Sequence, residues 1–282
     1  MKNTTLTIVG VGLLGGSIAL AAKERSLAGT IVGVGRNPDR LAMARDAGLI
    51  DEIVTDLALA AARSDAMIFC TPVDEIARQV QIAARVCSSR CLLTDVGSTK
   101  QTIVEQVEQS CGPNVPFVGS HPLAGSEKQG WRYADAKLFV GRTVVITPTA
   151  QSLPAAVDRA RRFWRDLGAH VVEMEPGEHD SVLARTSHLP HVVAATLAAC
   201  LRLKHEELKF AATGLRDTTR IAAGDADLWA AIILENRREI SKALASFQEA
   251  LTGWLPALQS GDREAIKSLL EQGKQSRDAL GN

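Results

Sequence analysis

A glycine-rich turn between an apolar strand and a helix constrains the fold of this chain more than any other feature. The turn Gly10-Val11-Gly12-Leu13-Leu14-Gly15 ends the apolar run of residues 5–12 and opens a helical pattern over residues 14–26. In a βαβ unit, the first glycine permits a tight turn, the second lets a pyrophosphate approach the backbone, and the third allows close helix packing. The helix N-terminus then faces the anion. The sequence therefore predicts a dinucleotide site that includes Gly10, Gly12, Leu13, Leu14 and Gly15.

Short apolar runs and helical patterns alternate over the first 176 residues. Such alternation is typical of βαβ units and a parallel sheet. The apolar runs show no polar alternation, which suits a sheet that is covered on both faces. We therefore predict a Rossmann-type α/β fold with a doubly wound parallel sheet. The expected strands are residues 5–12, 30–36, 66–72, 91–98, 116–122, 142–148 and 169–176, and the expected helices are 14–26, 38–47, 99–110 and 153–168.

The pattern changes after Pro176. Only helical patterns follow, over residues 178–203, 205–223, 225–257 and 262–279. A chain of 282 residues is long enough for two ordinary domains. We predict a dinucleotide-binding domain over 1–176 and an all-α domain over 177–282. The apolar stripes of these helices need a partner surface, so we expect a homodimer through the helical domain.

Composition narrows the classes of partner. Lys and Arg together number 32, as do Asp and Glu, and this balance argues against a nucleic-acid partner. No apolar run approaches the ~20 residues that span a bilayer, and the N-terminal run lacks a signal-peptide cleavage pattern. The five cysteines form no metal-ligand spacing. We expect reduced thiols, no metal site and a cytoplasmic location.

The end of the second expected strand indicates which dinucleotide binds. NAD-preferring sites usually carry an acid there, bonded to the ribose 2′-hydroxyl. This chain has Arg36 instead, whose guanidinium fits a 2′-phosphate. The sequence predicts NADP in preference to NAD. Asp39 lies just downstream and leaves the use of both cofactors open.

One histidine stands where a base is needed. His121 follows an expected strand, at the edge where open α/β sheets bind ligands, and a neutral imidazole can accept a proton near pH 7. In the first helix of the second domain, Ser187 and His191 are four residues apart and share a face, which His188 does not. We interpret the remaining histidines as surface or packing residues: His170, His179 and His205.

At these residues the chain resembles the prephenate/arogenate dehydrogenase family of tyrosine biosynthesis. The matching motifs are GVGLLGGS, FCTP, TDVGSTK, GSHPLAGSEKQG, LF-GR-VVITP, SHLPH and GLRDTTRIAAGDADLW-AIILEN, which span most of residues 8–236. The resemblance implies a dinucleotide-binding domain followed by a helical dimerisation domain. It also implies a prephenate dehydrogenase, which converts prephenate to 4-hydroxyphenylpyruvate by oxidative decarboxylation and reduces NAD(P)+.

The resemblance also assigns roles to individual residues. His121 would take the proton of the ring C4 hydroxyl while hydride leaves C4 for the nicotinamide. Ser98 would orient His121 and touch the hydroxyl and the nicotinamide, and Arg220 would hold a substrate carboxylate. Further substrate contacts fall on Ser126, Glu127, Ser187, His191, Asp217 and Trp229, and further cofactor contacts on Thr71 and Pro72.

Several readings stay open. His191 and Glu127 favour prephenate over arogenate, but an arogenate or dual-substrate cyclohexadienyl dehydrogenase remains an alternative, and an amino-substituted prephenate is a third. Another two-domain reductase, such as a 3-hydroxyacid dehydrogenase or an imine reductase, would lack HPLAGSE and RDTTR. A dinucleotide-sensing protein without turnover would keep the glycines but would not need His121, Ser98 and Arg220 together.

Overall fold

The computed structural model describes residues 4–125 and 128–281. Its contacts divide the chain into two compact units, Met1–Asn236 and Arg237–Asn282. The first unit holds the complete sheet together with the helices up to residue 235. The boundary that the sequence predicts, between residues 176 and 177, lies inside this unit and stays a prediction about functional domains.

An eight-stranded sheet forms the centre of the first unit, with the strand order β3-β2-β1-β4-β5-β6-β7-β8. Every neighbouring pair is parallel except β6 and β7, which run antiparallel. The short edge strand β3 has no apolar run, which is why sequence analysis did not predict it. The strands are β1 (Thr5–Val9), β2 (Thr30–Val34), β3 (Glu52–Val54), β4 (Ala66–Phe69), β5 (Leu92–Asp95), β6 (Phe117–Pro122), β7 (Thr143–Thr147) and β8 (His170–Glu173).

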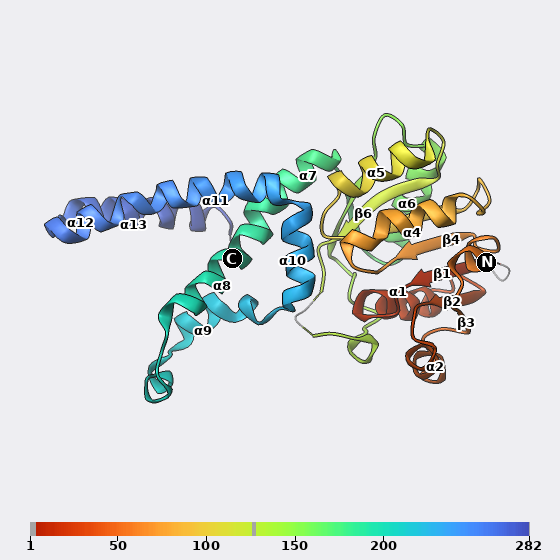
Figure 1. The fold of residues 1–282 in the computed structure, drawn as a ribbon, viewed down its shortest axis with the longest axis horizontal. Helices are drawn as coiled ribbons and strands as arrows, with labels where there is room; N and C mark the ends of the chain where they lie inside the picture. The colour runs from red at the N-terminus through yellow and green to blue at the C-terminus, as the bar shows by residue number, and fades with distance from the viewer. Residues whose placement is uncertain (1–3, 126–127, 282) are drawn as a thin grey trace. The chain divides into compact units, whose positions relative to one another are not determined.

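Helices cover both faces of the sheet, which confirms the doubly wound fold (Figure 1). Helices α1 (Leu13–Glu24), α2 (Pro38–Asp46) and α6 (Pro154–Asp166) pack on one face, where Trp164 is completely buried. The other face is covered by α3 (Leu57–Ala61), α4 (Val73–Ala84) and α5 (Gln101–Cys111), and Ile232 joins this second cluster from α10 (Ala226–Glu235). Two apolar clusters, one on each face, therefore hold the sheet.

The antiparallel strand β7 departs from the predicted all-parallel sheet. A parallel neighbour would need a crossover connection, usually a helix, whereas the segment between β6 and β7 contains only the short 3-10 helix η1 (Trp131–Tyr133) in its described part. The chain therefore turns back along the same edge, and His121 pairs with Val145 in the ladder. Strand pairing thus fixes the backbone of His121.

The four helical stretches that the sequence predicts after Pro176 are helical, but three of them are interrupted. Residues 178–203 contain a π turn, and residues 205–223 alternate between 3-10 and α-helix. Residues 225–257 are divided among three helices. The elements after Pro176 that belong to the first unit are α7 (Pro176–Leu183), the π turn η2 (Ala184–His188), α8 (Leu189–Leu201), η3 (His205–Phe210), α9 (Thr213–Thr219), η4 (Arg220–Ala223) and α10. The second unit consists of α11 (Arg237–Thr252), α12 (Trp254–Ser260) and α13 (Arg263–Asp278).

Across residues 4–125 and 128–281, no helix is both long enough and apolar enough to cross a membrane. The same residues contain no group of three or more His, Cys, Asp or Glu side chains that could hold a metal ion.

A buried ion pair lies at the carboxyl edge of the sheet. Asp95 ends β5 and Lys100 precedes α5, and both side chains are completely buried and joined by a hydrogen bond. The Asp95 carboxylate also accepts hydrogen bonds from the backbone N–H groups of Gly97 at 2.8 Å and Ser120 at 2.9 Å. Burial lowers the pKa of Lys100, and the neighbouring Asp95 carboxylate opposes this shift. The pair therefore joins β5, β6 and the start of α5.

We expect Lys100→Met to lower the free energy of unfolding by about 3–5 kcal/mol, because it leaves the Asp95 carboxylate buried without its counter-charge. Urea denaturation measures this loss. Glu75→Gln is the matched control, since Glu75 forms an exposed pair with Arg78 and its removal should cost less than about 1 kcal/mol. Equal losses in the two variants would contradict this account of the buried pair.

Candidate active site

A cavity of about 880 Å³ opens at the carboxyl edge of the sheet. Parallel strands end at the same edge, so the segments that follow β1, β4, β5 and β6 all reach it. The predicted site residues in its lining are Gly12, Leu13, Leu14, Ser98, His121, Ser187 and Trp229. Residues from the start of the sheet and from the later helices thus meet around one space. Ser126 and Glu127, which the sequence also singles out, lie outside the described residues.

The three glycines of the turn meet three different constraints. Gly10 has a φ of 93°, and a Cβ atom there would lie 2.7 Å from the carbonyl oxygen of Cys70. A Cβ atom on Gly15 would lie 2.3 Å from the carbonyl oxygen of Gly10, so only glycine lets α1 pack this closely. A Cβ atom on Gly12 would have no neighbour within 4 Å. The backbone at Gly12 therefore borders open space, as a site for a pyrophosphate requires.

The other predicted cofactor residues follow neighbouring strands at this edge. Arg36 is exposed just after β2, next to Asn37, whose side chain caps α2 by accepting from the backbone N–H of Arg40 at 3.0 Å. Thr71 Oγ1 donates to Gln79 Oε1 at 2.7 Å, and Pro72 precedes α4. All three lie outside the lining of the cavity in the described part of the chain. Their contacts with a cofactor remain predictions.

His121 belongs to a chain of three side chains. Its Nδ1 lies 2.9 Å from Nε2 of His179, and Nδ1 of His179 lies 2.7 Å from a carboxylate oxygen of Asp180. His179 is completely buried. Burial lowers the pKa of His121 well below 6.5, and the nearby His179 and Lys100 lower it further. His121 is thus neutral near pH 7 and can accept a proton.

The interpretation of His179 as a surface or packing residue was therefore incomplete, because its ring bonds directly to His121. No local pattern links these two histidines, which are 58 residues apart along the chain. A sequence signal for a functional role of His179 was the adjacent Asp180, together with the position of both residues in the first helix after β8. That helix, α7, packs against α5, the helix that follows β5.

Asp180 joins α7 to the start of α5. Its two carboxylate oxygens accept hydrogen bonds from the backbone N–H groups of Lys100 at 2.8 Å and Gln101 at 2.9 Å. These N–H groups have no partner within their own helix, and the helix dipole favours a negative charge beside them. The side chain of Asn236 donates to the carbonyl oxygen of Asp180 at 2.8 Å. Asp180 is therefore fixed on both its backbone and its side chain.

The π turn changes which side chains of the next segment reach the cavity. The sequence predicts a regular helix in which His188 does not share a face with Ser187, but both residues line the cavity. A π turn adds a residue to the helical repeat and so re-aims the side chains within it. His188 is buried and its Nδ1 lies 3.1 Å from Nδ2 of Asn236; burial lowers its pKa from 6.5 to about 4.

His191 and Trp229 form a stacked pair. Their ring centroids are 3.5 Å apart and their planes differ by 13°. Nδ1 of His191 is buried and makes no hydrogen bond to any of the described residues. Trp229 itself lines the cavity, so the stack forms part of the wall beside the space.

The cations that line the cavity differ from the one that the sequence singles out. Arg220 and Asp217 are exposed and lie outside the lining among the described residues. Lys128 and Arg142 do line it. Sequence analysis missed Arg142, although it directly precedes β7 and so returns to the edge where β6 ends. Arg142 gives the lining of the cavity a positive charge.

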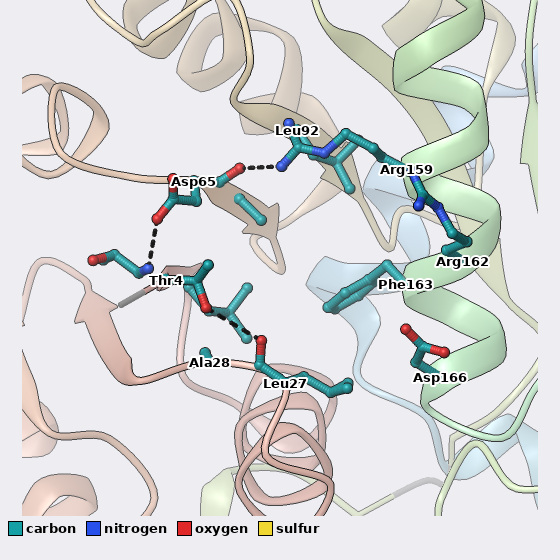
Figure 2. A pocket seen from close by; sticks show the side chains of 12 residues that line it. Thr4, Leu27, Ala28, Asp65, Leu92, Arg159, Arg162, Phe163 and Asp166 are labelled. Atoms are coloured by element: carbon teal, nitrogen blue, oxygen red, sulfur yellow. Dashed lines mark hydrogen bonds between the residues drawn. The ribbon is translucent and has the colours of Figure 1, made fainter. Parts of the chain in front are cut away.

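A second cavity, of about 240 Å³, lies at the amino ends of β1 and β4 (Figure 2). Its wall includes Leu27, Phe163 and Arg159, and the guanidinium of Arg159 donates to the carbonyl oxygen of Asp65 at 2.7 Å. None of the predicted site residues lines it. The candidate active site is therefore the cavity at the carboxyl edge.

Comparisons with known proteins agree with this assignment. The family model for the nucleotide-binding domain of prephenate dehydrogenase matches residues 18–173, and the one for its dimerization domain matches residues 175–272. Prephenate dehydrogenase of Bacillus subtilis is 33% identical over 99% of this chain and 76% of its own length. Cyclohexadienyl dehydrogenase of Zymomonas mobilis is 30% identical over 98% of this chain and 95% of its own length.

Among solved structures, prephenate dehydrogenase of Aquifex aeolicus in complex with hydroxyphenyl propionate and NAD+ superimposes with a TM-score of 0.90. The two chains are 32% identical, and the match covers 99% of each. The shared fold therefore extends over the helices as well as the sheet.

Variants of Gly12 and Gly15 should distinguish an effect on dinucleotide binding from an effect on helix packing. We expect Gly12→Ala to keep the free energy of unfolding but to weaken binding of a reduced dinucleotide on the order of tenfold or more, because the added methyl enters the open space. Gly15→Ala should instead lower the free energy of unfolding by about 1–3 kcal/mol, because its methyl meets backbone. Fluorescence titration and urea denaturation measure the two effects. Unchanged dinucleotide affinity in Gly12→Ala would be the contrary result.

Proposed function

Because the chain belongs to the prephenate dehydrogenase family, we propose that it oxidises and decarboxylates prephenate to 4-hydroxyphenylpyruvate. The family makes it an NAD(P)-dependent oxidoreductase. The observation that carries the proposal is His121, a neutral base that lines the same cavity as the open glycine turn. A base and a dinucleotide site that share one cavity are what the oxidation of an alcohol needs.

The reaction is balanced by one proton and one hydride. Nε2 of His121 takes the proton of the ring C4 hydroxyl as hydride leaves C4, and the bound nicotinamide supplies the hydride acceptor. The ring carboxylate then leaves as CO2, and its electron pair makes the ring aromatic. The proton on His121 returns to the phenolate oxygen. His121 therefore ends the cycle neutral, ready for the next substrate.

Charge in the cavity supports an acidic substrate. Prephenate carries two carboxylates, and Lys128 and Arg142 present cations in the lining. We retain Arg220 as the second candidate for a carboxylate contact, with Asp217 as the residue that braces it; the motif match supports both. Ser98 is proposed to contact the hydroxyl and the nicotinamide, and its place in the lining supports that role.

We propose prephenate in preference to arogenate. The amino-acid side chain of arogenate would bring an ammonium toward the cations of the cavity, whereas the ketoacid of prephenate brings none. The relative from Zymomonas mobilis is named a cyclohexadienyl dehydrogenase, which supports the use of both substrates as the alternative.

We further propose a homodimer that forms through the helical domain. The match to a dimerization domain over residues 175–272 supports it. Several leucines in the second unit are also exposed, including Leu255 at 62%, Leu258 at 60% and Leu270 at 58%, and a partner surface would cover them. The five free cysteines suit the reducing cytoplasm, which we propose as the location.

The test of function supplies prephenate or arogenate with NADP+ or NAD+ and follows the absorbance of the reduced cofactor. His121→Ala should bind cofactor normally and lose kcat by about 10²–10⁴-fold. In the wild type, the acid limb of kcat/KM should lie below pH 6.5, because burial lowers the pKa of His121 and the base stays neutral down to that lower value. Dinucleotide binding without turnover of either acid would indicate a sensor instead.

Cofactor choice has its own test. We propose that NADP is preferred to NAD, and the exposed Arg36 after β2 supports this. Arg36→Ala should raise KM for NADP+ about tenfold, because it removes a charge-assisted bond to the 2′-phosphate, and leave KM for NAD+ unchanged. Arg45→Ala is the control, since Arg45 is an exposed arginine on α2 that pairs with Asp46. A wild-type kcat/KM that is higher with NAD+ would refute the preference.

A further inference from the structure

We propose that His179 is a positioning residue for the reaction, which holds His121 in the one tautomer that can act as the base and links it to the Asp180 carboxylate. This inference rests on the proposed function. It concerns a residue that no sequence motif pointed to, and it follows from the hydrogen bonds of three side chains and from what each atom can donate or accept.

The direction of the hydrogen bonds follows from Asp180. A carboxylate only accepts, so Nδ1 of His179, 2.7 Å away, must carry the hydrogen. A neutral His179 then has its lone pair on Nε2, which lies 2.9 Å from Nδ1 of His121. Nδ1 of His121 must therefore carry the hydrogen of that ring. Nε2 of His121 is left with the lone pair, and it is this nitrogen that can take a proton from a ligand in the cavity.

Asp180, at the end of this hydrogen-bond chain, is held in place by several hydrogen bonds. Both oxygens of Asp180 accept from the first backbone N–H groups of α5, and one of them also accepts from His179. If the carboxylate rotated away from His179, those N–H groups would lose their hydrogen-bond acceptor. Because the residues that carry them are buried or half-buried, this loss would be costly. A fixed carboxylate fixes the ring of His179, and that ring in turn fixes the ring of His121.

The surroundings of His121 explain why this link matters for rate. Burial disfavours a positive charge on His121, and Lys100 at the start of α5 disfavours it further, while His179 and His188 approach the ring from α7 and the π turn. Of the two carboxylates nearby, Asp95 is paired with Lys100. Asp180 is the one that the hydrogen-bond chain connects to His121. When His121 holds the substrate proton, both hydrogen bonds of the chain become charge-assisted and stabilise the imidazolium. His179 and Asp180 gain and lose no proton in this step.

A packing role for His179 leads to different expectations. A residue that only fills space would tolerate an apolar side chain of similar volume, and its loss would change stability but not the tautomer of His121. The proposed role predicts that the tautomer and kcat change together while substrate and cofactor still bind.

The test compares His179→Leu with His179→Gln in the full-length enzyme. Leu removes the acceptor, so we expect kcat to fall about 10²–10⁴-fold, with KM and the dinucleotide Kd within about threefold of wild type. The amide oxygen of Gln can still accept from Nδ1 of His121, so the loss should be at least about tenfold smaller than for Leu. His170→Leu, which removes an exposed histidine on β8, is the control and should leave kcat unchanged.

Histidine ¹⁵N NMR shifts give a readout that needs no substrate. In the wild type at neutral pH, His121 should show a protonated Nδ1 and an unprotonated Nε2, and His179→Leu should shift His121 toward the opposite tautomer or a mixture. A wild-type His121 protonated on Nε2 would overturn the inference, as would a kcat for His179→Leu equal to that of His170→Leu. If His179→Leu fails to bind dinucleotide, the Gln variant and the wild-type spectrum decide. If the wild type turns over neither acid, the proposed function fails, while the spectrum still tests the tautomer.

Discussion

The buried pair of Asp95 and Lys100 is the interaction on which the rest of the site depends. Asp95 receives the backbone N–H of Ser120 and so sets the position of β6 immediately before His121. Lys100 presents its own backbone N–H to Asp180, which bonds to His179. Between the two residues, the loop 96–99 carries Ser98 to the cavity. One ion pair thus positions the base, its hydrogen-bond partner and the serine beside them.

The same pair also shapes the electrostatics of the site. The buried ammonium of Lys100 opposes proton uptake by His121, and the Asp95 carboxylate paired with it reduces this effect. What remains, together with burial and the other histidines, keeps the pKa of His121 low. A low pKa alone would make His121 a weak base. In the proposed mechanism, the hydrogen-bond chain through His179 to Asp180 offsets this, because its bonds become charge-assisted when His121 holds a proton.

Local patterns in the sequence predicted the fold and singled out several residues that line the cavity. The glycine turn, the strand ends and His121 depend on residues that are close together in the chain, so a motif can represent them. Three other features could not be predicted from such motifs. The hydrogen bond between His121 and His179 joins segments 58 residues apart. The antiparallel direction of β7 depends on a connection that lacks an α-helix. The π turn does not follow the regular helical repeat from which the helix was predicted. Arg220 shows a different limit of motifs. Its motif is specific, but the motif alone does not indicate whether the side chain lines the cavity.

Under the proposed mechanism, the three-residue chain gives the helices after β8 a part in the reaction in addition to the proposed role in assembly. The match to the nucleotide-binding family model ends at residue 173 and the match to the dimerization model begins at residue 175, so His121 and Lys100 lie in the first part while His179 and Asp180 lie in the second. Neither part alone holds both ends of the hydrogen-bond chain. His121 acquires its acceptor only when α7 packs against α5, and that contact is secured by the bonds from α5 to Asp180. In the proposed mechanism, the capacity of His121 to remove a proton therefore depends on the packing of α7 against α5, which brings His179 to Nδ1 of His121.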